Sequence, residues 1–151
     1  MEYVIQCIAA FFGCFGFSFI FRIHKHINHS IYGSIIGAIG WIIYLALANA
    51  KNVYLQSFMA MLFVALASEC LARLCKAPAT IFIMLGFFPL VPGSGIYYTM
   101  LYAVRGQPSL FIDSLLSTLG IAMSLSFAIL ISSTIIKVFR RIKRRKFDIV
   151  E

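Results

Sequence analysis

The chain has 151 residues, of which 62% are hydrophobic and 12% are charged, and its formal net charge is +8. Soluble domains carry about 25% charged residues, so a water-soluble fold is excluded. The composition predicts an all-α integral membrane protein that forms a single transmembrane domain over residues 1–151.

Long uncharged runs occupy most of the chain. A bilayer core about 30 Å thick needs roughly 20 apolar residues per helix, and five runs are long enough or nearly so. Five transmembrane helices are therefore predicted, with approximate bounds 3–21, 31–50, 53–75, 79–104 (broken at 89–95) and 111–136, followed by a basic tail over 137–151. The first run follows Glu2 and has no basic segment before it, so we interpret it as a retained helix and not as a secretory signal.

The second run carries glycines at positions 33, 37 and 40, which fall on one helical face. Small residues on one face allow membrane helices to approach closely. The fifth run has a similar stripe at Ser117, Gly120, Ser124 and Ala128. Two such seams in a short chain predict a partner, either a larger subunit or a second copy.

Near its end, the third predicted helix carries the carboxylate Glu69 and, four residues later, Arg73. This spacing favours a Glu–Arg pair on the helix surface. An acid within a membrane span is also a candidate for proton coupling or gating. The sequence leaves both readings open.

The fourth run is the most informative about function, because it contains helix-breaking residues near its centre. As one unbroken helix its 28 uncharged residues would be about 42 Å long, well beyond the hydrocarbon thickness. Pro89 and Pro92 lack the backbone N–H that a helix needs, and Gly93 and Gly95 permit unusual backbone angles. The helix is therefore expected to unwind between Pro89 and Gly95, close to the bilayer midplane.

Unpaired backbone groups at that depth are tolerated only inside protein or beside a polar cavity. The half-helix that begins near Gly95 is expected to aim free N–H groups at a carboxylate, with Ser94, Tyr97 and Tyr98 beside it. Carbonyls around Leu85–Phe88 would face a cation or an ammonium group. A purely architectural kink is the alternative.

The fifth run follows Pro108 and carries Asp113 in its first turns, where an acid complements the helix dipole. With five crossings, one side of the membrane receives all but two of the 13 basic residues, the exceptions being Lys51 and Arg105. The positive-inside rule then places the N-terminus outside and the C-terminus in the cytoplasm. The basic tail is expected to bind anionic lipid, and this placement argues against a nucleic-acid partner.

The stretch Lys76-Ala-Pro-Ala-Thr-Ile-Phe, together with Pro89-Leu-Val-Pro-Gly-Ser-Gly-Ile-Tyr-Tyr-Thr-Met100, resembles the threonine/serine exporter family, and the whole chain resembles its small, YjjB-type membrane subunit. The resemblance implies a bacterial inner-membrane protein that pairs with a larger five-helix subunit. It implies export of small carboxylates, either threonine and serine or a dicarboxylate such as succinate.

A transport subunit explains the central break, whereas the alternative, a non-transporting scaffold or assembly partner, explains only the seams. An enzyme is disfavoured because no catalytic constellation can be assembled from so few polar residues. No cofactor is expected. No metal site is expected either, because the three histidines at 24, 26 and 29 lack further ligands and the four cysteines show no ligand spacing.

Overall fold

The computed structural model describes residues 2–21, 27–50 and 52–147, and that part of the chain is helical with no strand. In chain order the helices are α1 (Glu2–Ile20), α2 (Ile27–Ala46), the 3₁₀ turn η2 (Leu47–Ala50), α3 (Val53–Leu74), α4 (Ala79–Phe87), the 3₁₀ turn η3 (Phe88–Leu90), α5 (Gly93–Val104) and α6 (Pro108–Phe147). Three of the basic residues counted for the membrane orientation, Arg22, Lys25 and Lys51, lie outside the described residues.

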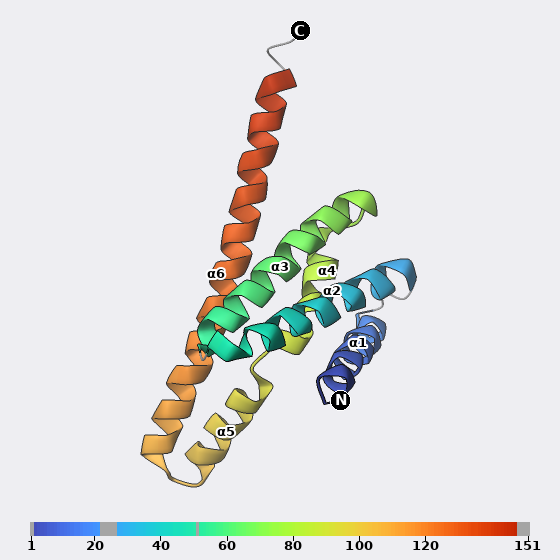
Figure 1. Cartoon of the computed structure of the whole chain (residues 1–151). Coiled ribbons are helices and arrows are strands. Elements are labelled where there is room, and N and C mark those ends of the chain that lie inside the picture. The colour runs from blue at the N-terminus through green and yellow to red at the C-terminus, as the bar shows by residue number, and fades with distance from the viewer. Residues whose placement is uncertain (1, 22–26, 51, 148–151) are drawn as a thin grey trace.

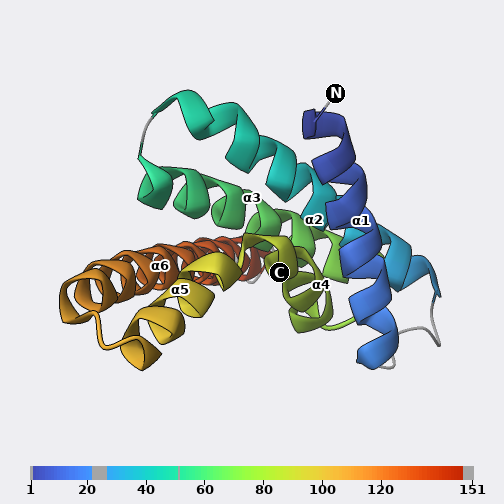
Figure 2. The ribbon, with the colours of Figure 1, turned by 90° about the horizontal axis from the view of Figure 1, so that it is seen from below.

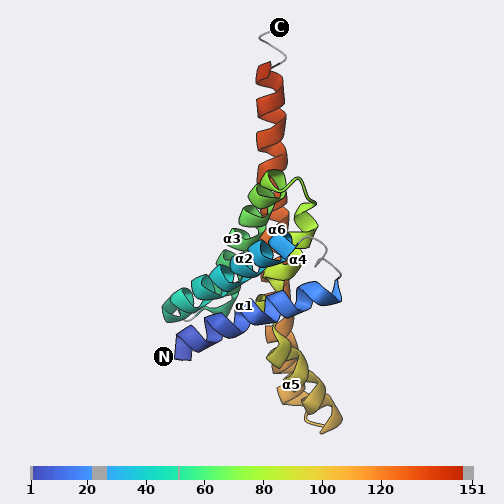
Figure 3. The same ribbon diagram turned by 90° about the vertical axis from the view of Figure 1, so that its right-hand side faces the viewer.

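Four helices, α1, α2, α3 and α6, are each long and apolar enough to cross a membrane, and α4 with α5 makes a fifth span if the bent pair is one crossing. This confirms the all-α membrane fold. The bend between α4 and α5 is 57°, far from the reversal that a re-entrant hairpin requires. Helix α3 runs in the same general direction as α6, whereas α2, α4 and α5 run in the opposite direction (Figures 1 and 3). This alternation is consistent with five crossings.

The interruption of the fourth span follows from its two prolines. Pro89 and Pro92 lack N–H groups, and between them the chain forms η3 and then an extended residue, Val91, with φ −62° and ψ 129°. Helical geometry resumes at Gly93. The break is therefore shorter than the expected 89–95, and Gly95 is helical, because the prolines interrupt the hydrogen bonds without help from the glycines.

Helix α6 has 40 residues and is therefore about 60 Å long, twice the hydrocarbon thickness. It begins at Pro108 and continues past residue 136, the expected end of the span, to Phe147. The basic segment is thus a continuation of the helix up to that residue. Lysine and arginine are good helix formers, and neither proline nor glycine follows Gly120.

The glycine face of α2 is packed inside this chain. A Cβ added to Gly37 would lie 2.6 Å from the sulfur of Cys14 on α1 and 3.3 Å from the Cα of Gly86 on α4. Added Cβ atoms at the other two positions would meet Leu85 at Gly33 and Val64 at Gly40. The close-packing role is as expected. However, the seam is filled by α1, α3 and α4, so it gives no evidence for a second subunit.

The stripe on α6 is likewise used internally, because Gly120 packs under the ring of Tyr54 on α3 and Ala128 is fully buried. Viewed from below, α5 and α6 lie side by side at one edge of the molecule (Figure 2). One buried hydrophobic cluster, which we call the central core, consists of Ile36, Ala60, Met61, Val64, Ala65, Leu90, Leu125 and Ala128. It joins α2, α3 and η3 to the middle of α6.

We predict that Gly37→Leu loosens the packing of α2 against α1 and α4, because the new side chain meets backbone as well as the Cys14 sulfur. Overpacking of this kind costs about 1–3 kcal/mol. The measurement is the apparent melting temperature of the purified chain in detergent. Gly16→Leu is the matched control, since a Cβ there meets nothing within 4 Å. Equal melting temperatures for the two variants would contradict the packing assignment.

Candidate functional site

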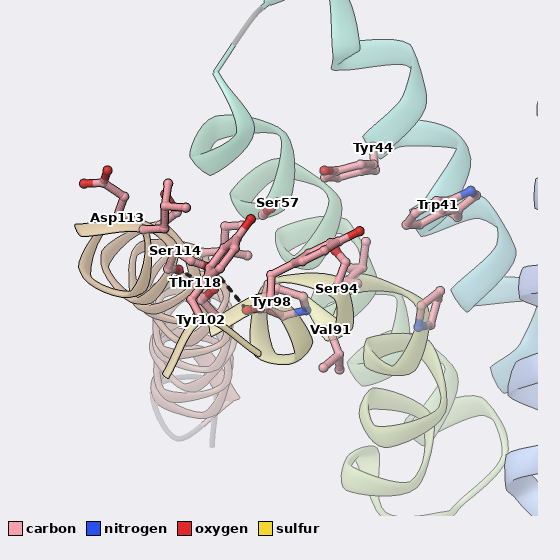
Figure 4. Close-up of a pocket in the computed structure, with 17 residues that line it drawn as sticks. Trp41, Tyr44, Ser57, Val91, Ser94, Tyr98, Tyr102, Asp113, Ser114 and Thr118 are labelled. Atoms are coloured by element: carbon pink, nitrogen blue, oxygen red, sulfur yellow. Dashed lines mark hydrogen bonds between the residues drawn. The ribbon is translucent and has the colours of Figure 1, made fainter. Parts of the chain in front are cut away.

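A cavity of about 480 Å³ lies at the break of the fourth span (Figure 4). Five elements contribute to its wall, and Ser94 and Tyr98 of α5 lie between Trp41 and Tyr44 of α2 on one side and the α6 residues on the other. The lining residues are Trp41, Tyr44, Ser57, Pro89, Leu90, Val91, Pro92, Ser94, Gly95, Tyr98, Tyr102, Leu110, Asp113, Ser114, Ser117, Thr118 and Ile121.

The start of α5 presents two free backbone donors at this cavity. Gly93 N–H donates to the carbonyl of Val91 at 2.7 Å, and Ile96 N–H donates to the carbonyl of Pro92 at 3.1 Å. Within the described chain, the N–H groups of Ser94 and Gly95 have no backbone acceptor, and no side chain caps the helix. Both residues line the cavity. Two N–H groups at the positive end of a helix dipole suit a small anion.

Most of the predicted binding residues come together at the cavity. Pro89, Pro92, Ser94, Gly95 and Tyr98 line it. The two other candidates, Gly93 and Tyr97, do not line it, and the Tyr97 side chain is 63% exposed. Tyr97 is one position round the helix from Tyr98 and so faces away, whereas Ser94, Tyr98 and Tyr102 follow the helical repeat along the wall.

Gly95 also has a packing role that the sequence did not reveal. A Cβ at this position would collide with the hydroxyl of Thr118 on α6. The same contact region holds a hydroxyl network, in which Thr99 Oγ1 donates to the carbonyl of Gly95 at 2.7 Å and lies 2.9 Å from Ser114 Oγ. Thr118 Oγ1 donates to the Ser114 carbonyl at 2.7 Å. The contact between Thr99 and Ser114 joins α5 to α6, whereas the bonds to Gly95 and Ser114 each lie within one helix.

Trp41 and Tyr44, which the sequence did not mark as site residues, form part of the wall. Their rings stack with centroids 5.1 Å apart and an interplanar angle of 16°. The indole Nε1 of Trp41 is buried and has no hydrogen-bond partner in the described part of the protein. Trp41 and Tyr44 are three residues apart near the end of α2, so the sequence places them on one face of that helix. Only the packing of α2 beside the break brings this face to the cavity.

Among the described residues, Asp113 supplies the only charged side chain of the lining. It lies in the early turns of α6, as the dipole argument expected, but it is also exposed at the cavity. In Figure 4 it lies at the opposite end of the drawn residues from Trp41. The cavity therefore combines N–H donors near the break with one carboxylate at its far end.

Two of the carbonyls expected to face a cation have partners in the protein, because the Phe88 carbonyl accepts from the Val91 N–H at 3.4 Å and the Leu85 carbonyl lies in a helix contact. The side chain of Leu85 is fully buried, and its carbonyl oxygen lies against Gly37 in the contact between α4 and α2. The cavity wall begins only at Pro89. The end of α4 is thus covered by the glycine face of α2, and Asp113 is the group on this wall that can attract a cation.

The acid–base pair Glu69 and Arg73 lies in the last turns of α3, and neither residue lines the cavity. Glu69 is half-buried and Arg73 is exposed. Their coupling or gating role stays a prediction. Among the described residues no three His, Cys, Asp or Glu side chains meet as metal ligands would.

The cavity lies nearer to one end of α2 and α3 than to their middles. Ser57 is in the second turn of α3, and Tyr44 is in the last turn of α2. Ser57 is buried, and its hydroxyl donates to the carbonyl of Val53 at 2.9 Å. The only support for placing the break at the bilayer midplane is that it lies near the centre of the span formed by α4 and α5. The midplane position therefore stays a prediction.

Comparison with known proteins supplies one match. A family model described as "Threonine/Serine exporter, ThrE" matches residues 6–135, which include every residue that lines the cavity. The comparisons with curated proteins and with solved structures found no significant match.

We predict that Gly95→Ala weakens the contact between α5 and α6 by about 1–3 kcal/mol, because its Cβ meets the Thr118 hydroxyl. Thr118→Ala removes that hydroxyl and leaves the remaining Thr118 Cβ at 3.4 Å, an ordinary contact. Adding it to Gly95→Ala should therefore restore stability. The measurement is a double-mutant cycle of melting temperatures. Strictly additive effects would show that the two residues do not interact.

Proposed function

Because the chain belongs to the threonine/serine exporter family, we propose that it is a membrane subunit of a secondary transporter and that it binds its small carboxylate substrate at the start of α5. The observation that carries this proposal is the pair of unbonded N–H groups at Ser94 and Gly95, which open onto a cavity of about 480 Å³.

The binding step relies on backbone donors, since among the described residues no lysine, arginine or histidine lines the cavity. A hydrogen bond to a charged group contributes about 1.5–3 kcal/mol, so two such donors can hold one carboxylate. The hydroxyls of Ser94 and Tyr98 lie on the same wall and can add further hydrogen bonds. The prolines keep these donors free by ending the previous half-helix before α5 begins.

The charge of the lining favours an amino acid over a dicarboxylate. Asp113 would repel the second carboxylate of succinate and attract the ammonium group of threonine or serine. The serine, threonine and tyrosine hydroxyls of the wall suit the hydroxyl of these substrates. Threonine and serine are therefore the proposed substrates, and a dicarboxylate is the second choice.

The transporter is proposed to need a partner, the larger five-helix subunit that the family resemblance implies. The structure gives this some support, because α5 packs chiefly on α6 and exposes Ile96 and Met100 on other sides. A second copy of the chain is the alternative partner. The bacterial inner membrane, with the N-terminus outside and the C-terminus in the cytoplasm, is the proposed location, and anionic lipid is expected around the basic end of α6.

A scaffold that carries no substrate remains the competing function. It would need the packing of the helices, which is present, but it has no use for free N–H groups at a polar cavity. Substitutions that alter only those groups therefore separate the two functions.

We predict that Ser94→Pro removes one N–H donor and the hydroxyl, and that threonine efflux falls by about tenfold or more, the effect of one hydrogen bond to a charged group. Proline is tolerated in the first turn of a helix, and α5 begins at Gly93. Ser94→Ala keeps the N–H and should lose less, about twofold to tenfold. Efflux from cells is measured per amount of inserted protein.

The control for this comparison is Ser126→Ala, which removes an exposed hydroxyl of α6 that bonds only to the carbonyl of Ala122. It should export like the wild type. Wild-type efflux by Ser94→Pro would mean that the break is only a kink and would remove the basis of the binding site.

We predict that Asp113→Asn lowers threonine efflux by about tenfold, because the substrate's ammonium group loses a charged partner. Succinate should then compete better, since the repulsion is gone. Asp113→Glu keeps the charge and should retain most of the activity. The measurement is efflux of labelled threonine with and without succinate inside the cell. Unchanged selectivity in Asp113→Asn would show that this carboxylate does not contact substrate.

A further inference from the structure

Three buried serine hydroxyls, those of Ser30, Ser68 and Ser132, have no hydrogen-bond partner in the described part of the chain, and the last two lie on the neighbouring helices α3 and α6. Ser68 on α3 and Ser132 on α6 have 0% exposure, and neither hydroxyl has a partner. Other hydroxyls on the same helices donate to the carbonyl one turn earlier, as Ser57 does to Val53 and Thr134 to Leu130. A buried hydroxyl without a partner is destabilising, so this pair requires an explanation.

Both serines lie at the same level of the molecule. Helices α3 and α6 run side by side in the same direction (Figures 1 and 3). On α3, Ser57 lines the cavity and Ser68 follows three turns later. On α6, Ile121 lines the cavity and Ser132 follows at the same interval. Each serine is therefore about 16 Å beyond the cavity along its helix.

Apolar side chains separate the cavity from this level. Along α3 they are Ala60, Met61 and Val64, and along α6 they are Leu125 and Ala128, all members of the central core and at most 2% exposed. Beyond the serines, α3 ends just after Arg73, and α6 continues into its basic segment at Lys137. By the positive-inside rule, the serines lie on the cytoplasmic side of the core and the cavity lies on the outer side.

We propose that Ser68 and Ser132 form a second polar station of the transport path, which the substrate reaches between α3 and α6 when the central core opens on the cytoplasmic side. This inference rests on the proposed function. In the structure the central core lies across this path, and both hydroxyls are fully buried. In the opposite state, water and substrate solvate them, as alternating access requires.

The test uses an introduced thiol as a probe of water. Ser132→Cys is placed in a chain whose accessible cysteines, Cys7, Cys70 and Cys75, are replaced by serine, while the buried Cys14 is kept. A small anionic methanethiosulfonate sulfonate, a reagent that reacts with hydrated thiolate, is added to inside-out membrane vesicles with and without threonine. We expect Ser132→Cys to be modified, at a rate that threonine changes by severalfold.

Ser126→Cys is the matched control, because it lies on the same helix, is exposed, and should face lipid in the membrane. A thiol in lipid neither ionises nor meets the reagent. The chain without an introduced cysteine gives the background. Modification of Ser132→Cys no faster than Ser126→Cys in either condition would overturn the proposal. Absence of threonine efflux from the wild-type chain with its partner would instead overturn the proposed function.

Alanine substitutions give a second readout that a structural role would not produce. Ser68→Ala with Ser132→Ala removes two unsatisfied hydroxyls, so the melting temperature should stay the same or rise. Efflux should nevertheless fall by about twofold to tenfold, the effect of losing a neutral hydrogen bond to substrate. Wild-type efflux from this double variant would contradict the second station.

Discussion

The need to satisfy backbone hydrogen bonds inside a bilayer is the constraint on which the rest of this structure depends. Pro89 and Pro92 remove two N–H groups from the fourth span, so its hydrogen-bond ladder ends in η3 and begins again at Gly93. The new helix start leaves the N–H groups of Ser94 and Gly95 unbonded. Such groups are stable in a membrane only beside a polar cavity, and the cavity at this point provides that environment.

The two halves of the broken span are anchored to different neighbours. Helix α4 packs on α2 and α3, where Gly37 and Gly86 allow the backbones to approach. Helix α5 packs on α6 through Gly95, Thr118 and the hydroxyl network. The break therefore separates two packed units, one formed by α4 with α2 and α3 and the other by α5 with α6. The two units contact each other where α6 packs on α3. A relative movement of these units changes the cavity and the central core together, and this links the proposed binding site to the proposed path.

The chemistry of the cavity combines neutral donors with one negative charge. The donors are fixed by main-chain geometry, so they require no basic side chain at membrane depth, where a charge is costly. Asp113 is exposed near the start of α6, where its carboxylate is solvated and favoured by the helix dipole. This arrangement accepts a carboxylate at one end and an ammonium group at the other, in keeping with the family to which the chain belongs.

The sequence by itself determined the class of protein, the presence of several long apolar helices, the break at Pro89–Pro92 and the family, because apolar run length, proline chemistry and short motifs act locally along the chain. Five of the seven predicted binding residues reach the cavity for the same reason. Only the tertiary structure decided the rest. It filled the α2 seam with this chain's own helices, made Gly95 a packing residue, and brought Trp41, Tyr44 and Asp113 to the wall. Those roles depend on which faces of distant helices meet, and a single sequence without its packing does not specify those contacts.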